Sequence, residues 1–260
     1  MSDAPQIAII VRNLKIGYGE KVILQNVNFD VRHGEVFVIL GGSGCGKSTL
    51  LKNLIGLYAP IEGEVWIEGG NLLAARDNDR LFLLRKFGVM YQSGALFGSM
   101  TVLENVRLPL DEFTALPEPV KELVALAKLK LVGLGAAAQK LPSELSGGMQ
   151  KRAAIARAMA LDPRILFLDE PSAGLDPVTS AGLDLLIKEL SQHFGITFII
   201  VTHELASIYK IADRVVMLDS RTRTVIAEGK PAELREHAAD PWVRRFFNRE
   251  PDSAEAAQPI

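Results

Sequence analysis

Short apolar runs separated by turn residues fill the first part of the chain. From Ile7 to Val31, apolar and polar positions alternate between turns rich in glycine and asparagine, and Glu64 to Glu68 repeats this alternation. A period of two is typical of β-strands that bury one face and expose the other. We therefore predict antiparallel strands in these two segments.

Several later runs are apolar at almost every position. They are Val36 to Leu40, Ile165 to Leu168, Thr197 to Val201 and Val215 to Leu218. Strands that are buried on both faces give such runs. The segments between them carry helical patterns, for example from Ser48 to Leu57. This alternation of strand and helix predicts a parallel α/β sheet.

The segment after Pro177 has clear helix-start signals. Asp176 is suited to cap the helix, and proline favours the first helical position. Its apolar residues recur at helical spacing on one face, at Leu183, Leu186, Ile187, Leu190 and Phe194. We expect an amphipathic helix that packs on the sheet.

No comparable strand pattern occurs from about Thr101 to Ala160. Helical patterns occupy Val120 to Leu131 and Gln150 to Ala160 instead. We interpret about residues 93–160 as a helical subdomain inserted into the α/β core.

Composition places the chain among globular proteins. Its 260 residues are 48% hydrophobic, which is enough to bury a full core. The 29 basic and 31 acidic residues are mixed along the chain and leave a net charge of −2, so no polycationic surface for nucleic acid is expected. The single cysteine, Cys45, excludes an intrachain disulfide and fits a reducing compartment.

Neither a signal peptide nor a membrane span is expected. The start, MSDAPQ, is polar, and the longest apolar runs fall far short of the roughly 20 residues that cross a bilayer. We expect the chain to stay in the cytoplasm, so that any membrane role requires a separate membrane subunit.

The turn after Val36 to Leu40 matches the phosphate-binding pattern G-x-x-x-x-G-K-[ST]. It comprises Gly41, Gly42, Ser43, Gly44, Cys45, Gly46, Lys47 and Ser48, followed by Thr49. Glycines let successive N–H groups point at phosphate oxygens, and the next helix adds its positive N-terminal dipole. We expect ATP here, with Lys47 on the β- and γ-phosphates and Ser48 on Mg²⁺. Cys45 is interpreted as a small filler of the loop.

Two acids end the apolar strand from Ile165 to Leu168. In open parallel sheets, the carboxyl ends of the strands face the ligand crevice. Asp169 is therefore expected to complete the Mg²⁺ shell through water, and Glu170 to polarise the attacking water as a general base. Without the phosphate loop, two adjacent acids would more often form a solvated strand end.

A third element opens the helical stretch KRAAIARAMA. It is the run Leu145-Ser146-Gly147-Gly148-Met149-Gln150, and in it Ser146 and two glycine N–H groups form a second anion site. Together with the phosphate loop and the two acids, this run resembles the signature motif of ABC ATPases. In that family the signature of one subunit closes on ATP held by another. The resemblance therefore implies a head-to-tail dimer that traps two nucleotides.

This resemblance extends from about Ile7 to Glu250. It implies an α/β fold, with a RecA-like P-loop NTPase core, an antiparallel β subdomain and the inserted helical subdomain. We expect residues 1–240 to form the nucleotide-binding domain and residues 241–260 a tail.

The resemblance also implies roles for scattered residues. Tyr18 matches the aromatic residue that stacks on adenine, Gln92 the glutamine that senses Mg²⁺ and the attacking water, and His203 the histidine on the γ-phosphate. The run from Ser172 to Asp176 matches the loop that contacts the opposite subunit. Taken alone, such a tyrosine between glycines reads as a turn residue, and such a histidine as structural.

Two local runs narrow the class of transporter. Gln92 to Phe97 and Asp240 to Phe247 resemble the ATPases of Mla-type, MCE-associated lipid transporters of double-membraned bacteria. The resemblance implies phospholipid transport between the inner and outer membranes and a position on the cytoplasmic side of the inner membrane. The implied partners are a permease, an MCE lipid-binding protein and a STAS-domain protein.

Other functions stay open at this stage. Polar amino-acid importers have similar motifs, and a soluble ABC ATPase such as the iron–sulfur assembly type is a further alternative. A nucleotide-binding module without turnover is disfavoured because both Glu170 and His203 are present.

The tail carries four apolar residues at i, i+1, i+4 and i+5, namely Trp242, Val243, Phe246 and Phe247. This spacing predicts a short helix with one apolar edge. The edge could pack on its own core, but its position and the resemblance favour docking on the neighbouring ATPase subunit. The last run, SAEAAQPI, is expected to be disordered.

Overall fold

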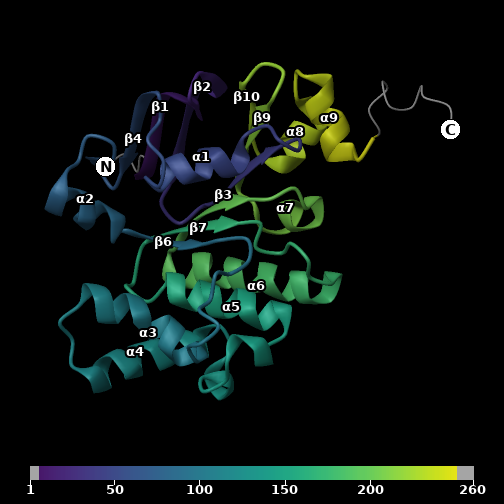
Figure 1. The fold of residues 1–260 in the computed structure, drawn as a ribbon. Coiled ribbons are helices and arrows are strands. Elements are labelled where there is room, and N and C mark those ends of the chain that lie inside the picture. Colours follow the sequence, from purple (N-terminus) through teal and green to yellow (C-terminus); the bar gives the residue numbers. More distant parts are fainter. Residues whose placement is uncertain (1–5, 251–260) are drawn as a thin grey trace, which may run out of the picture.

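A six-stranded sheet runs through the computed structural model of the chain, which describes residues 6–250 (Figure 1). Its strand order is β10-β9-β3-β8-β7-β6, and β10 alone among these strands pairs antiparallel with its neighbour. The strands are β3 (Val36–Gly41), β6 (Phe87–Met90), β7 (Ile165–Asp169), β8 (Thr197–Val201), β9 (Arg214–Asp219) and β10 (Thr224–Gly229). The predicted parallel sheet is confirmed.

A second, antiparallel sheet has the order β2-β1-β4-β5. Its strands are β1 (Ile7–Tyr18), β2 (Lys21–Arg32), β4 (Glu62–Ile67) and β5 (Gly70–Asn71). The period-two segments therefore form the antiparallel strands that the sequence predicts.

The helices divide into those beside the sheets and those of a separate lobe. They are α1 (Lys47–Leu54), α2 (Asp77–Leu84), α3 (Val102–Phe113), α4 (Glu118–Leu131), α5 (Gly147–Ala158), α6 (Pro177–Phe194), α7 (Leu205–Ile211), α8 (Pro231–His237) and α9 (Pro241–Asn248). In Figure 1, α3, α4 and α5 lie together below the six-stranded sheet, and in sequence they stand between β6 and β7. No helix within residues 6–250 is long and apolar enough to cross a bilayer.

Alternate residues of the six-stranded sheet point into two different cores. On β3, Val38 and Leu40 belong to the core that the sheet shares with α3, α4, α5 and α6. Phe37 and Ile39 point the other way, into the core shared with α1 and the antiparallel sheet. All four side chains are fully buried. Each such burial contributes about 1.5–3 kcal/mol, so both faces hold the sheet in place.

Side-chain caps fix the helix starts. Asp176 accepts hydrogen bonds from the backbone N–H groups of Val178 and Thr179, both at 3.0 Å, which confirms it as the cap of α6. Thr101 and Glu104 form a reciprocal capping box at the start of α3. Such caps stabilise a helix by about 1 kcal/mol each and set where it begins.

The tail forms the short helix that was predicted, but its apolar edge packs on its own chain. Val243 and Phe247 of α9 are buried in the same core as Val38 and Leu40. The Tyr209 hydroxyl donates to the Phe247 carbonyl at 2.9 Å. For these two side chains the prediction of docking on a neighbouring subunit is wrong. The physical reason is that α7 and α8 already offer them an apolar surface. The run SAEAAQPI lies outside the described residues.

Several elements were not predicted from the pattern. Helices α2, α7 and α8 have seven or eight residues each, and edge strand β10 is only half-buried. Short helices and half-covered edges leave a weak periodic signal, because few of their positions face a core.

One glycine sets how closely the helical lobe approaches the sheet. A Cβ atom at Gly88 on β6 would lie 1.9 Å from the Ala158 carbonyl oxygen at the end of α5. We predict that Gly88→Ala lowers the free energy of unfolding by at least about 1–3 kcal/mol, the usual cost of overpacking. Thermal unfolding measures this. Gly98→Ala is the matched control, since a Cβ there meets nothing within 4 Å; equal melting temperatures for the two variants would contradict the prediction.

Candidate nucleotide-binding site

The predicted site residues gather at one edge of the six-stranded sheet. The phosphate loop follows β3, Asp169 ends β7 with Glu170 directly after it, and Gln92 and His203 each stand two residues beyond β6 and β8. These four strands are parallel, so their carboxyl ends meet at the same edge. The fold alone thus brings together residues as far apart in sequence as Gly41 and His203.

The phosphate loop depends on glycines for its shape. Gly46, the cap residue of α1, has φ of 104°, and a Cβ there would lie 2.6 Å from Ile23. Ser43 and Gly44 at the crest are exposed, whereas Cys45 is buried beneath them. Burial raises the pKa of the Cys45 thiol, which fits its interpretation as a filler rather than a reactive group.

Lys47 lies folded over the start of its own loop. Its ammonium donates to the carbonyl of Gly41 at 2.9 Å and to the carbonyl of Gly42 at 3.0 Å. The charge is thereby held beside the loop N–H groups, where a phosphate would arrive.

Ser48 and Asp169 bring two oxygen ligands together. The Ser48 hydroxyl lies 3.5 Å from Asp169 Oδ1. Burial raises the pKa of Asp169, and the neighbouring Glu170 raises it further. A hydroxyl and a buried carboxylate fit Mg²⁺, which binds through one or two protein oxygens and takes its other ligands from phosphates and water.

Glu170 and His203 form a hydrogen-bonded pair. His203 Nδ1 lies 2.8 Å from Glu170 Oε1. Glu170 has a left-handed backbone, with φ of 46°, and its N–H donates to the Val201 carbonyl at 2.8 Å. Such a conformation costs on the order of 1–3 kcal/mol in a non-glycine residue and is common at active sites. It turns the carboxylate away from the path of β7.

Two cations of α5 hold the segment after β6, and the sequence reasoning missed both. Lys151 donates to the Gln92 carbonyl, and Arg157 donates to the carbonyls of Gly94 at 2.8 Å and Ala95 at 2.7 Å. Burial lowers the pKa of Lys151, opposed by the nearby Asp169 and Glu170. The available signal was three cations, Lys151, Arg152 and Arg157, in an alanine-rich helix.

The signature residues contact a different part of the same chain. Ser146 caps α5 by accepting from the Met149 N–H at 3.3 Å, and Gln150 donates to the carbonyls of Pro142 and Leu145. A Cβ at Gly148 would lie 2.3 Å from Thr179 on α6. The signature helix therefore packs against the start of α6.

The residues matched to the dimer loop lie beside this packing. Ser172 is buried and its carbonyl accepts from the Leu175 N–H at 3.1 Å, whereas Asp176 is exposed where it caps α6. A Cβ at Gly147 would lie 3.5 Å from the Leu175 side chain. The loop and the signature helix thus form one continuous surface.

Tyr18 lies at the far end of the phosphate loop. Its hydroxyl is 3.3 Å from the Thr49 hydroxyl on α1, and its ring makes an edge contact with Tyr58. Half of the residue stays exposed. An exposed ring beside the loop helix has the shape of a stacking platform for a planar base.

Known proteins share this arrangement. The sequence pattern of the family described as ABC transporter matches residues 24–173. The intermembrane phospholipid transport system ATP-binding protein MlaF of Escherichia coli is 40% identical over 92% of this chain and 87% of its own length. The probable ribonucleotide transport ATP-binding protein mkl of Mycobacterium leprae is 40% identical over 93% of this chain and 69% of its own length.

Solved structures agree with the fold. The ATP-binding cassette MJ0796, a dimer in a post-hydrolysis state bound to ADP and Pi, superposes with a TM-score of 0.76 at 34% identity over 85% of this chain and 98% of its own. The cbiO1 protein of Clostridium perfringens gives 0.81 at 31% identity over 89% and 92%. The expected fold class is therefore confirmed. Matched over more than half its length by the family pattern, and with relatives near 40% identity along most of it, the chain belongs to the ABC transporter family as one of its ATP-binding subunits.

Proposed function

We propose that this chain hydrolyses MgATP to power a transporter that moves phospholipid between the inner and outer membranes of a double-membraned bacterium. The observation that carries the proposal is its 40% identity to MlaF over 87% of that protein's length. The relative named for ribonucleotide transport is equally identical, but this chain spans only 69% of it. The length match therefore favours the phospholipid function.

The residues at the sheet edge suit hydrolysis. Lys47 exchanges its loop carbonyls for the β- and γ-phosphates, and Glu170 takes a proton from water as that water attacks the γ-phosphorus. The bond from the γ-phosphorus to the bridging oxygen breaks, and ADP leaves with that oxygen. His203, paired with Glu170 through Nδ1, offers its second nitrogen to the γ-phosphate. Ser48 and Asp169, with Gln92 nearby, would hold Mg²⁺, which would supply positive charge to the phosphate oxygens.

A second copy of the chain would complete the site. The Ser146 hydroxyl and the N–H groups at the start of α5 form an anion site, and in this chain their contacts lead to α6 rather than to the phosphate loop. Two chains placed head to tail would each supply this anion site to the other's ATP, and Ser172 to Asp176 would lie at the contact. The dimeric state of the cassette MJ0796 supports this arrangement.

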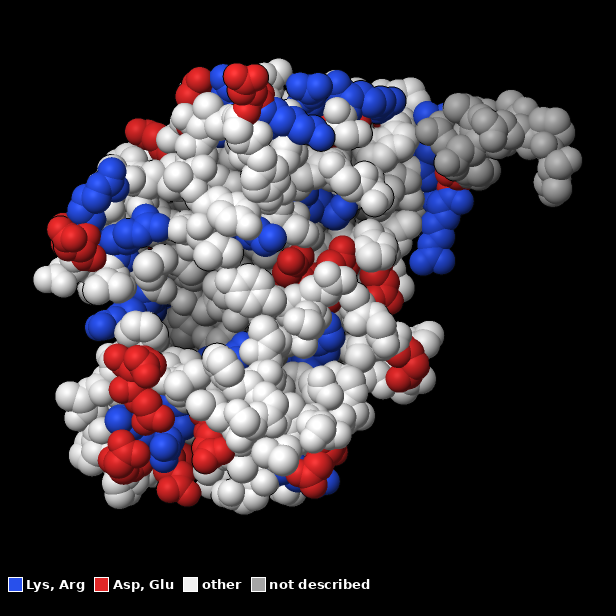
Figure 2. Space-filling view, in the orientation of Figure 1, with Lys and Arg blue, Asp and Glu red and all other residues white. Residues whose placement is uncertain are grey.

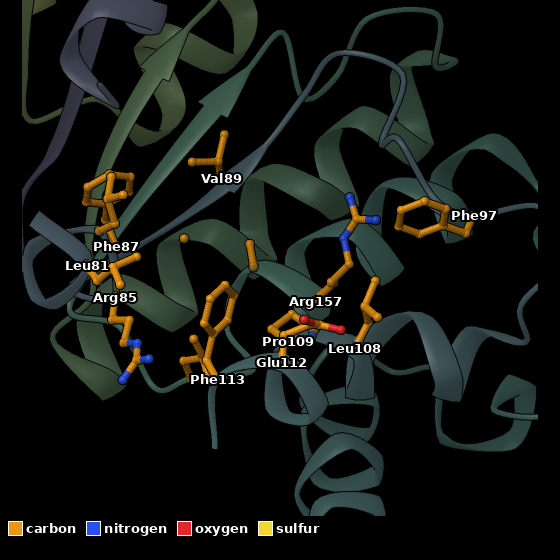
Figure 3. A pocket seen from close by; sticks show the side chains of 14 residues that line it. Leu81, Arg85, Phe87, Val89, Phe97, Leu108, Pro109, Glu112, Phe113 and Arg157 are labelled. Atoms are coloured by element: carbon orange, nitrogen blue, oxygen red, sulfur yellow. The ribbon is translucent and has the colours of Figure 1, made fainter. Parts of the chain in front are cut away.

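An apolar pocket of about 380 Å³ offers a docking place for the permease (Figure 3). It is lined by Leu81, Leu84, Phe87, Val89, Phe97, Leu108, Pro109 and Phe113 among others. Leu81 and Phe87 lie at one end of the pocket and Phe97 and Leu108 at the other, as Figure 3 shows. Figure 2 shows the surface hollowed between the two lobes. Two of the lining rings, Phe97 and Phe113, are about half exposed, so a partner can cover them.

Arg157 links this pocket to the nucleotide. It lines the pocket and also donates to the Gly94 and Ala95 carbonyls, just beyond Gln92. A permease segment bound in the pocket would therefore displace the chain just after Gln92, the residue expected to sense the attacking water.

The other implied partners follow from this assignment. An MCE lipid-binding protein and a STAS-domain protein would join the permease, and the chain would sit peripherally on the cytoplasmic side of the inner membrane. The face shown in Figure 2 carries both acidic and basic side chains, and we propose no nucleic-acid partner.

Replacing the general base tests the hydrolysis mechanism. We predict that Glu170→Gln slows turnover about 10²–10⁴-fold, or roughly 3–5 kcal/mol of barrier, while ATP binding survives. The variant should then accumulate as an ATP-bound dimer in size-exclusion chromatography. A variant that stays monomeric with ATP would contradict the dimeric arrangement; Lys47→Ala, which loses the phosphate-binding charge, is the non-binding control.

We expect Asp169 to lower the stability of the folded chain at neutral pH and to be required for Mg²⁺-dependent turnover. Because burial raises its pKa above the unfolded value, the folded chain binds this proton more tightly, and stability falls as pH rises through that window. We predict that Asp169→Asn, measured at pH 7 without nucleotide, melts up to about 4 °C higher than the unchanged chain, and that this gain shrinks toward pH 4. Mg²⁺-dependent turnover should fall at least about 100-fold. A lower melting temperature at pH 7 would contradict this account.

The permease assignment is tested at the pocket. We predict that Phe97→Asp or Phe113→Asp abolishes co-purification of a membrane permease from detergent extract, because a charge cannot be buried in the apolar contact. ATP hydrolysis by the isolated chain should stay within about twofold. Leu123→Asp, which changes a more exposed apolar residue on α4 outside the pocket, is the control. Unchanged recovery of the permease with both phenylalanine variants would exclude this docking place.

A further inference from the structure

The tail helix lies beside the phosphate loop. A Cβ atom at Gly42, the second residue of the loop, would lie 3.8 Å from Cζ2 of Trp242, the second residue of α9. Glycine lacks that atom, so the indole faces the loop backbone across a gap that a methyl group would fill. We propose that Trp242 is a positioning residue for the phosphate loop and that it couples the tail to nucleotide binding.

Residues at and just after the end of β9, the strand beside the start of the loop, hold the indole in place. Arg221 lies over the Trp242 ring, 5.5 Å from its centroid, and its guanidinium pairs at 2.8 Å with the buried Asp219. Asp219 ends β9 directly after Leu218, which is the register partner of Gly41. One ion pair thus ties the orientation of the ring to the loop's own neighbouring strand.

The start of α9 is fixed by a second carboxylate. Asp240 accepts from the Trp242 N–H at 2.8 Å and lies 3.9 Å from the Arg221 guanidinium. The buried side chains of Val243 and Phe247 anchor the rest of the helix. Moving the indole would break these contacts together. The ring is therefore held in one orientation beside the loop and does not rotate freely.

The loop residue that the indole faces is the one whose bonding is expected to change with ligand. The Gly42 carbonyl accepts from Lys47 at 3.0 Å, and under the proposed function Lys47 exchanges such bonds for phosphate oxygens. The inference rests on that function. Removing the Trp242 indole would leave the Gly42 backbone free to adopt other conformations. Nucleotide binding would then weaken, while Glu170 and its chemistry stay unchanged.

Steady-state kinetics test the role. We expect Trp242→Ala to raise KM for MgATP about 3- to 10-fold, because the loop could then adopt conformations that the indole excludes, with kcat within about twofold. Trp242→Phe should recover part of this. Tyr209→Phe, which removes the hydroxyl donated to Phe247 and loosens the same helix away from the loop, should leave KM unchanged. A lower melting temperature for Trp242→Ala with an unchanged KM would overturn the proposal and leave Trp242 a purely structural residue.

Tryptophan emission gives a second measurement. The chain has two tryptophans, and the other, Trp66, lies on β4. In a Trp66→Phe background, titration with MgADP or MgATP should shift or quench the Trp242 emission, and the further change Lys47→Ala should remove the response. Constant emission while calorimetry records nucleotide binding would overturn the inference. Absence of calorimetric binding by the unchanged chain would instead refute the proposed function, so the two failures are distinguishable.

Discussion

The parallel register of the six-stranded sheet is the constraint on which the site depends. Asp213 pins the start of β3 by accepting from the Val36 N–H at 2.8 Å, and the two cores clamp the sheet from both faces. A slip of one residue between strands would displace the loop by about 3.3 Å relative to Asp169. That is nearly the whole distance from Ser48 to Asp169, 3.5 Å, so binding geometry and strand register cannot be separated.

Three energetically unfavourable features lie at this same edge. Glu170 has a left-handed backbone, Asp169 is a buried carboxylate with a raised pKa, and Lys151 is a buried cation with a lowered one. Comparable features occur elsewhere, because burial also raises the pKa of Glu35 and Asp184, and Asp162 also has a left-handed backbone. The surrounding fold, with its capped helices and apolar strands, supplies the stability that offsets these unfavourable terms.

Features that depend on neighbouring residues were predictable from the sequence. The phosphate loop, the Asp176 cap and the apolar strands can each be recognised from a stretch of about ten residues. Lys151, Arg157 and Trp242 do not, because their partners lie far away in sequence and only the packing of α5 and α9 brings them together. The same limit explains the tail: the apolar edge was visible, but the surface that receives it was not.

The burial of Cys45 beneath the loop crest lowers the reactivity expected of its thiol toward oxidants. A thiol with a raised pKa yields little thiolate, and thiolate is the form that peroxides attack. Oxidation to a sulfinate would place a fixed negative charge inside the loop that must receive phosphates. With this sulfhydryl buried, the loop exposes little thiolate that an oxidant could attack.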